Sequence, residues 1–239
     1  MDTNGAVSKE LTIDVSRGRI TGDLEIPADA SGIVVFAHGS GSSRFSSRNR
    51  FVAGELRKRG LGTFLLDLLT EEEEAIDRYT REYRFDIELL AGRLVTAIRT
   101  IADMEDMPAL PIGSFGSSTG AAAALIAAAR LGPLMSAVVS RGGRPDLAGD
   151  ALASVISPVL LIVGGLDTEV IGLNRGAFER LTSEKKLVIV QGATHLFEEP
   201  GTLEKVADLA GEWFSDHFRP EREANDPQRE AGQRSQSAR

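Results

Sequence analysis

Gly116-Ser117-Ser118-Thr119-Gly120 lies where an apolar run, residues 110–115, gives way to an alanine-rich run, residues 121–129. This is a G-x-S-x-G pattern, and its setting predicts a strand that turns sharply into a helix. A serine on such a turn projects its Oγ away from the sheet, and the glycines let neighbouring backbone pass without a Cβ clash. Only Ser118 has a glycine two residues away on both sides, so we expect Ser118 to be a nucleophile.

The segments around this motif predict alternating strands and helices. Residues 11–15 and 20–26 predict an antiparallel hairpin. Continuous apolar runs predict buried strands at residues 33–37, 62–69, 134–139, 159–163 and 187–190. Periodic segments predict helices at residues 50–59, 85–102, 121–130, 175–182 and 203–217. The sequence therefore predicts an α/β protein with a doubly wound, mainly parallel sheet after an antiparallel start.

Length and composition predict one α/β domain, assigned to residues 9–218. The chain has 239 residues, of which 42% are hydrophobic, enough for a single full core. Residues 1–8 form an N-terminal extension in this interpretation. Residues 219–239 are polar and charged without apolar periodicity, which predicts a disordered tail. The gap between residues 139 and 159 is too short to hold a lid domain, so we expect an open site.

Charge and cysteine content exclude several classes of function. The net charge is −8 and the pI is about 5.1, which argues against a nucleic-acid-binding protein. The chain has no cysteine, so disulfides, zinc–thiolate sites and a cysteine nucleophile are excluded. Residues 1–10 are polar, unlike a signal peptide, and the run 121–129 is too short to span a bilayer. We expect a cytoplasmic protein without membrane association.

A serine nucleophile needs a base, and the chain has three histidines. His38 directly follows a predicted strand, and His217 lies near the end of the last predicted helix. His195 lies in Gly192-Ala193-Thr194-His195, a loop after the last predicted strand and on the same edge as Ser118. We therefore predict that His195 is the base. The alternative is a loop histidine that caps the following helix.

The acid that orients the base is expected between Ser118 and His195, at the carboxyl end of a strand. Asp167 meets this condition, because it ends Gly164-Gly165-Leu166-Asp167 after the strand at residues 159–163. The order Ser…Asp…His is the one used by hydrolases with this strand–turn–helix motif. The alternative is a turn or N-cap aspartate, for which this residue type is favoured.

An oxyanion hole requires backbone N–H groups aimed at the developing negative charge. The N–H of Thr119, the residue after the nucleophile, is one expected donor. The N–H of Ser40 is the other, in the small-residue loop His38-Gly39-Ser40-Gly41-Ser42-Ser43. This loop could instead be a flexible turn. A phosphate-binding loop is less favoured, because neither glycine-rich phosphate motif is present.

Together these motifs resemble the α/β-hydrolase superfamily over residues 9–217. More narrowly, the chain resembles dienelactone hydrolase-like proteins through Ala37-His38-Gly39-Ser40-Gly41-Ser42-Ser43, Gly116-Ser117-Ser118-Thr119-Gly120, Gly164-Gly165-Leu166-Asp167 and Gly192-Ala193-Thr194-His195. The resemblance implies a carboxylic-ester hydrolase. Well-known dienelactone hydrolases use a cysteine nucleophile, whereas this chain has Ser118 there. That departure favours a broader serine esterase over a dienelactone-specific enzyme.

Arginines follow two of the strands that lead to this edge. Arg141 follows residues 134–139, and Arg44 follows the small-residue loop. Guanidinium groups suit the bidentate recognition of carboxylates and phosphates, so both are candidates for binding a substrate anion. The alternative is solvated charge at the rim. The acidic run Glu71-Glu72-Glu73-Glu74 predicts a solvated loop or helix start rather than a metal site, because no histidine is near.

The predicted function is hydrolysis of small, soluble carboxylic esters through Ser118, His195 and Asp167, with no metal or organic cofactor. A small-molecule ester is the expected partner. The same residues could serve a thioesterase, acyltransferase, peptidase or perhydrolase. A hydrolase scaffold retained as a binding module is the alternative from a different class, and it is less favoured because all three residues are present.

Overall fold

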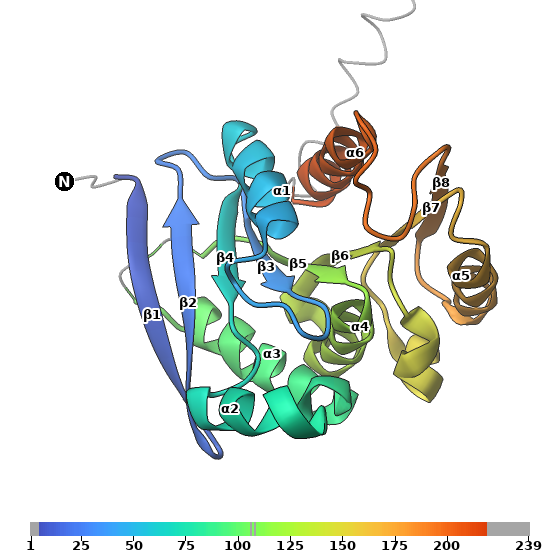
Figure 1. Cartoon of the computed structure of the whole chain (residues 1–239). Helices are drawn as coiled ribbons and strands as arrows, with labels where there is room; N and C mark the ends of the chain where they lie inside the picture. Colours follow the sequence, from blue (N-terminus) through green and yellow to red (C-terminus); the bar gives the residue numbers. More distant parts are fainter. Residues whose placement is uncertain (1–4, 106, 108, 219–239) are drawn as a thin grey trace, which may run out of the picture.

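The computed structural model describes residues 5–105, 107 and 109–218. Its centre is one eight-stranded sheet in the order β1-β2-β4-β3-β5-β6-β7-β8, with β1 at one end and β8 at the other (Figure 1). The strands are β1 (Val7–Val15), β2 (Gly18–Ile26), β3 (Ile33–Ala37), β4 (Gly62–Leu66), β5 (Ile112–Ser117), β6 (Met135–Arg141), β7 (Val159–Gly164) and β8 (Lys185–Val190).

The strand directions confirm the predicted fold class. β1 and β2 form an antiparallel hairpin, and β2 also pairs antiparallel with β4. From β4 to β8 every neighbouring pair is parallel. The carboxyl ends of these parallel strands therefore meet at one edge of the sheet, where α/β proteins bind their ligands.

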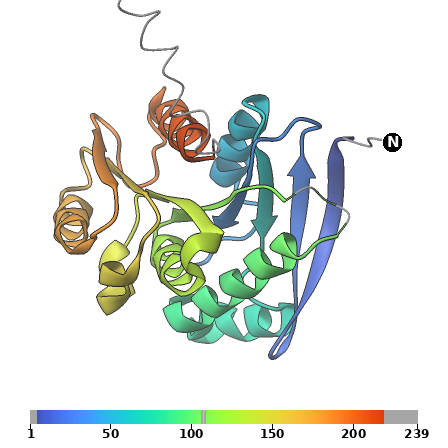
Figure 2. The same cartoon turned by 180° about the vertical axis from the view of Figure 1, so that it is seen from behind.

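Helices cover both faces of the sheet. They are α1 (Ser47–Lys58), α2 (Glu71–Thr80), α3 (Ile87–Ala102), α4 (Thr119–Leu131), α5 (Thr168–Arg180) and α6 (Thr202–His217), with short 3-10 segments at Tyr83–Phe85, Gly132–Leu134 and Pro145–Ser154. In both views α1 and α6 lie together, away from α3 and α4 (Figures 1 and 2). Only the short segment Pro145–Ser154 and its flanking loops separate β6 from β7, so no lid domain is inserted there.

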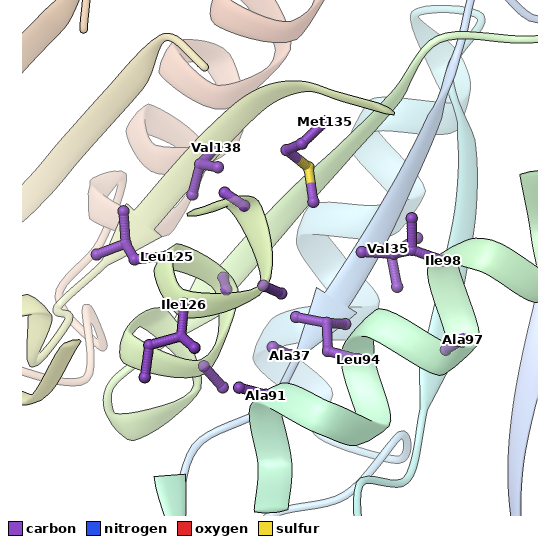
Figure 3. Close-up of a cluster of buried hydrophobic side chains, with 14 of the residues drawn as sticks. Val35, Ala37, Ala91, Leu94, Ala97, Ile98, Leu125, Ile126, Met135 and Val138 are labelled. Carbon is purple, nitrogen blue, oxygen red and sulfur yellow. The ribbon is translucent and has the colours of Figure 1, made fainter. Parts of the chain in front are cut away.

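The alternation of side chains along β3 divides the core into two parts, because successive residues of a strand face opposite sides of the sheet. Val34 and Phe36 pack in the cluster that α1 and α6 cover. Val35 and Ala37 pack in the cluster that α3 and α4 cover (Figure 3). Residues 121–128 of α4 are all buried, and their small side chains allow that helix to lie close to the sheet.

Helix α5 begins at Thr168, well before the predicted start at residue 175. Its buried positions are Val170, Asn174 and Ala177, which have helical spacing. Asn174 is polar and therefore interrupts the apolar pattern. It can be buried because its amide donates to the carbonyl groups of Gly143 and Val170. Apolar periodicity alone therefore could not detect the first turns of this helix.

The acidic run opens α2, and one of its members is not solvated. Thr70 caps the helix, and its side chain and that of Glu73 form a reciprocal capping box. The Glu73 carboxylate is buried and pairs with the buried Arg93 at 2.7 Å. The prediction of a solvated run was therefore wrong for Glu73, because the ion pair compensates the burial of its charge.

The first strand begins earlier than expected. β1 begins at Val7, four residues before the predicted start of that strand at residue 11. The predicted disordered tail, residues 219–239, lies outside the described residues. Among the described helices, none is long and apolar enough to cross a membrane.

Candidate active site

Ser118 lies on the sharp turn between β5 and α4 in a strained backbone conformation. Its φ of 50° and ψ of −122° are unusual for a residue with a side chain. A Cβ at Gly116 would lie 2.4 Å from the Cα of Ala121, and one at Gly120 would lie 2.2 Å from the carbonyl oxygen of Ala37. The G-x-S-x-G glycines are thus required by close backbone contacts on both sides of the serine.

Asp167 and His195 are joined by a hydrogen bond at the same edge of the sheet. Nδ1 of His195 lies 2.7 Å from Oδ2 of Asp167. A carboxylate only accepts, so Nδ1 donates in this hydrogen bond, and the neutral tautomer that fits it has its lone pair on Nε2. Asp167 occupies the N-cap position of α5 but makes no side-chain cap hydrogen bond. Its carboxylate is therefore directed to the histidine rather than to the helix.

The other two histidines are held in ways that do not suit a base. The buried His38 accepts from the Leu68 N–H through Nε2, so its Nδ1 donates to the carbonyl of Gly39. Burial lowers the pKa of His38, which keeps the ring neutral. His217 bonds the carbonyl of Trp213 through Nδ1 and faces Glu184 at 3.4 Å through Nε2.

The end of β6 lies between the serine and the histidine. The Ser118 N–H donates to the carbonyl of Arg141 at 3.2 Å. A Cβ placed on the next residue, Gly142, would lie 3.6 Å from Cε1 of His195. Ser118 and His195 therefore flank the same two residues. The hydrogen bonds of the described residues do not include one between Ser118 and His195, a contact that commonly tightens only when substrate binds.

Ser40 and Thr119 are also brought together, but in a different arrangement from the one expected. The Ser40 N–H donates to Oγ1 of Thr119 at 2.9 Å and is therefore already satisfied. The Thr119 N–H belongs to the first residue of α4, where helix N–H groups have no intrahelical acceptor. The prediction missed the Thr119 hydroxyl, because only backbone donors were considered. That hydroxyl accepts from Ser40 and retains a proton of its own to donate.

A hollow of about 490 Å³ opens between the loop that follows β3 and helix α2. Its lining includes Ser42 and Ser43 of the loop and the carboxylates of Asp67, Glu71 and Glu74. The same loop contacts the elbow at its other end, since a Cβ on Gly39 would lie 3.1 Å from Cβ of Ser118. The hollow is therefore close to the elbow, and its walls also include the apolar side chains of Phe45 and Leu69 and the cationic Arg78.

Arg141 is buried beside the elbow. Its Nη2 donates to Oγ of Ser117 at 3.1 Å, and Ser117 in turn donates to Oδ1 of the buried Asn49. The guanidinium carbon lies 5.7 Å from the ring centre of Phe197, another non-glycine residue with positive φ. Burial, followed by the charge of Arg48, lowers the pKa of Arg141 to about 10. Ser117 is part of the G-x-S-x-G motif, but the sequence did not predict the hydrogen bond between Ser117 and Asn49.

The Arg44 side chain lies among three carboxylates. It forms ion pairs with Glu10 at 3.0 Å, Asp23 at 3.3 Å and Asp67 at 3.3 Å. These contacts join β1, β2 and the end of β4. The expected role of Arg44 in binding a substrate anion is thus not supported, because its charge is already neutralised by the protein.

Comparison with known proteins agrees with the fold. A crystal structure of dienelactone hydrolase from Anabaena variabilis ATCC 29413 is 54% identical, has a TM-score of 0.87, and the match covers 90% of this chain and 99% of that one. Est1E from Butyrivibrio proteoclasticus has the same fold at 15% identity, with a TM-score of 0.73 and coverage of 87% and 98%. No family model matches the chain.

Two curated proteins of Mycobacterium tuberculosis, from strains CDC 1551 / Oshkosh and ATCC 25618 / H37Rv, are each 57% identical over 199 residues. Both carry a provisional phosphoribosyl transferase name. The match covers 83% of this chain but only 44% of either relative. More than half of each relative therefore lies outside the segment that resembles this chain.

The sheet order, the strained serine turn and the aspartate–histidine pair define the chain as an α/β-hydrolase. Its similarity to the Anabaena structure, which extends over nearly the whole of that protein, identifies the family within this superfamily. The chain belongs to the dienelactone hydrolase family.

Proposed function

We propose that the protein is a serine hydrolase of small carboxylic esters in the cytoplasm. The observation that carries this proposal is the hydrogen bond of 2.7 Å between Asp167 and His195 at the sheet edge where Ser118 adopts its strained turn. Ser118 attacks the ester carbonyl and His195 Nε2 removes its proton. Asp167 holds the imidazole in the tautomer that leaves Nε2 free to do so.

The reaction proceeds in two halves. Attack of Ser118 Oγ on the acyl carbon forms a tetrahedral oxyanion, and its collapse breaks the bond to the alcohol oxygen while His195 returns the proton to the departing alcohol. Water then attacks the acyl-enzyme, with His195 acting first as base and then as acid. The acid product and free Ser118 result. Every proton is supplied by these residues or by water.

Thr119 supplies two donors to the oxyanion in this proposal, its N–H and its hydroxyl. The Ser40 N–H donates to Oγ1 of Thr119 at 2.9 Å, which orients the hydroxyl and polarises it. Ser40 thus acts through Thr119 instead of contacting the substrate. The start of α4 adds the favourable end of the helix dipole.

Labelling with a fluorophosphonate tests the proposal, because this reagent modifies an activated serine. We expect the wild-type protein to be labelled at Ser118 and to hydrolyse short esters. Ser118→Ala should lose the label and about 10,000-fold or more of kcat/KM. Wild-type protein that resists labelling would exclude a serine hydrolase, and label that persists in Ser118→Ala would exclude Ser118 as the nucleophile.

The same machinery can transfer the acyl group to other acceptors, or act on thioesters or peptides. Product analysis with competing alcohols and amines separates these activities from hydrolysis. The phosphoribosyl transferase name of the mycobacterial relatives does not carry over to this chain, because the chain matches only 44% of their length.

A further inference from the structure

Helix α1 buries a polar residue at the first position of its apolar face. The buried residues of this helix are Asn49, Val52, Ala53 and Leu56, which have the spacing of a helix face that packs on a core. The last three belong to the cluster that α1 and α6 cover. Only 3% of the surface of Asn49 is exposed. Burial of an amide costs free energy unless its hydrogen bonds offset the loss of water, so the contacts of Asn49 decide why it is there.

Asn49 contacts the residue that precedes the nucleophile. Oγ of Ser117 donates to Oδ1 of Asn49 at 3.0 Å, and the same Oγ accepts from Nη2 of Arg141 at 3.1 Å. Arginine only donates, so the single proton of the Ser117 hydroxyl has Asn49 as its acceptor. All three residues are buried. Loss of the Asn49 oxygen would therefore leave a buried hydroxyl proton unpaired, which is costly.

This hydrogen bond lies next to the strained turn. Ser117 is the last residue of β5, and Ser118, the residue after it, has the φ of 50°. Strain of this kind persists only where the surrounding structure enforces it. The Ser118 N–H donates to the carbonyl of Arg141 at 3.2 Å, and the Ser118 carbonyl accepts from the N–H of Arg144 at 3.0 Å. Asn49 adds a tie from α1 to the residue immediately before the strain.

The start of α1 is held by hydrogen bonds of its own. Ser46 caps the helix, and its side chain accepts from the N–H of Asn49 at 3.4 Å. The Ser46 N–H donates to the carbonyl of Ser43 at 3.0 Å, at the end of the small-residue loop. Asn49 is therefore fixed relative to the loop that follows β3, and its side chain connects this loop to the end of β5.

The neighbouring residue, Arg48, contacts the segment that carries the base. It forms an ion pair of 3.1 Å with Glu198, which lies three residues after His195. The two side chains are 34% and 62% exposed, so solvent screens the pair and its contribution is small. The buried hydrogen bond from Asn49 is therefore the stronger of the two contacts that α1 makes beside the catalytic residues.

We propose that Asn49 is a positioning residue, which holds the Ser117 hydroxyl and thereby keeps Ser118 in the turn from which it attacks the substrate. This inference rests on the proposed function and specifies how its nucleophile is held. Asn49 acts through Ser117 and not on the substrate. Misplacement of a reacting group by about 1 Å lowers turnover about 100-fold, so a contact outside the triad has a large effect on rate.

Two substitutions at Asn49 test the proposal. Asn49→Leu removes the acceptor at a similar size, and we expect kcat on a short ester to fall about 10- to 100-fold while KM changes less than about threefold. Asn49→Asp keeps an acceptor oxygen, and the adjacent cation of Arg141 favours a carboxylate at this buried position. That variant should retain kcat within about threefold of the wild type. Asn49→Ala, which also removes the acceptor, replaces Asn49→Leu if the latter does not fold.

Val52→Ala is the matched control for stability, because Val52 is buried on the same face of α1. It should lower the free energy of unfolding through the cavity that it leaves, with kcat unchanged. Urea unfolding shows which variants are folded in the assay. A purely structural role of Asn49 predicts that folded Asn49→Leu keeps the wild-type kcat, as Val52→Ala does. That result, or an equal loss of kcat in Asn49→Asp and Asn49→Leu, would overturn the proposal.

Amide hydrogen exchange separates this inference from the proposed function, because it needs no turnover. The exchange rate of the Ser118 N–H, measured by NMR relative to that of Val35 in the central strand β3, reports local opening of the turn. We expect this ratio to rise at least about tenfold in Asn49→Leu and to stay at the wild-type value in Asn49→Asp and Val52→Ala. If the wild type hydrolyses no ester and no serine is labelled, the proposed function fails, while the exchange ratio still decides on the role of Asn49. An unchanged ratio in Asn49→Leu would show that Asn49 does not hold the turn.

Discussion

Charge is held in different ways on the two sides of the sheet's carboxyl edge. On the side of β1 to β4 it is paired within the protein. Arg44 pairs with three carboxylates, and the buried Glu73 pairs with Arg93. On the side of β5 to β8, Arg141 is buried without a carboxylate, and Ser118 is held in a strained conformation.

The difference indicates where the molecule gains stability and where it keeps groups available for chemistry. Backbone strain and an unpaired buried charge raise the free energy of the folded state, and a carboxylate partner offsets much of the cost of burying a charge. Structures tolerate such costs mainly at functional sites. Substitutions on the β5 to β8 side should therefore reduce activity, and substitutions on the other side should reduce stability.

Asp167→Asn should show the largest effect on the functional side. An amide places a donor opposite Nδ1 of His195 and favours the tautomer in which Nε2 carries the proton. We expect kcat to fall about 1,000- to 10,000-fold with little change in the unfolding temperature. Steady-state kinetics on a short ester, with thermal unfolding as the control, measure both. A loss below tenfold would show that Asp167 does not orient the base.

Glu73→Gln should show the largest effect on the structural side. It leaves the buried Arg93 without a charge partner, and breaking a buried ion pair in this way lowers the free energy of unfolding by about 3–5 kcal/mol. The kcat of the folded protein should not change. Urea unfolding measures the first quantity. The matched control is Glu72→Gln, because Glu72 is exposed on the same helix turn and should have little effect.

These two variants together test the comparison. If Glu73→Gln lowered kcat as strongly as it lowers stability, the paired side would also take part in the reaction. If Asp167→Asn mainly destabilised the fold, the hydrogen bond between Asp167 and His195 would be structural. Either result would contradict the assignment of stability to the β1 to β4 side and of activity to the β5 to β8 side.

The sequence predicted where the strands lie, but it did not predict which polar side chains contact each other. Apolar runs and glycines are local signals, so β3 and the turn at Ser118 could be recognised directly. The start of α5 could not, because the buried Asn174 breaks its apolar pattern. Buried ion pairs such as Glu73–Arg93 join residues 20 positions apart, and composition does not reveal which charges meet.

The candidate site shows the same limit. The order of Ser118, Asp167 and His195 could be predicted because each follows a recognisable strand. The two arginines could not be distinguished, since both follow strands that end at the same edge. Only the folded chain shows that Arg44 meets three carboxylates and that Arg141 meets none among the described residues. A position in the sequence identifies the edge but not the neighbours there.

Thr119→Val tests a smaller effect on the functional side and decides how Ser40 acts. Valine keeps the shape of threonine and its N–H but removes the hydroxyl. If the hydroxyl donates to the oxyanion, kcat should fall about 100-fold, and Thr119→Ser should restore most of it. If Ser40 instead donates directly to the oxyanion, valine frees its N–H and kcat should stay the same or rise.

His38→Gln should give the smallest effect, at the boundary between the two sides. Burial lowers the pKa of His38 below the value of 6.5 that applies in the unfolded chain, against the opposing influence of Asp67 and Glu74. The unfolded chain therefore binds a proton more readily, and stability falls as the pH drops from 6.5 toward the lower pKa of the folded state. This loss has a slope of at most about 1.4 kcal/mol per pH unit for one proton. Glutamine can still accept from the Leu68 N–H and donate to the Gly39 carbonyl but does not titrate, so urea unfolding between pH 7.5 and pH 5 should show a shallower slope. An unchanged slope would mean that other groups cause the acid sensitivity, and that His38 is neutral in the folded state at no cost to stability.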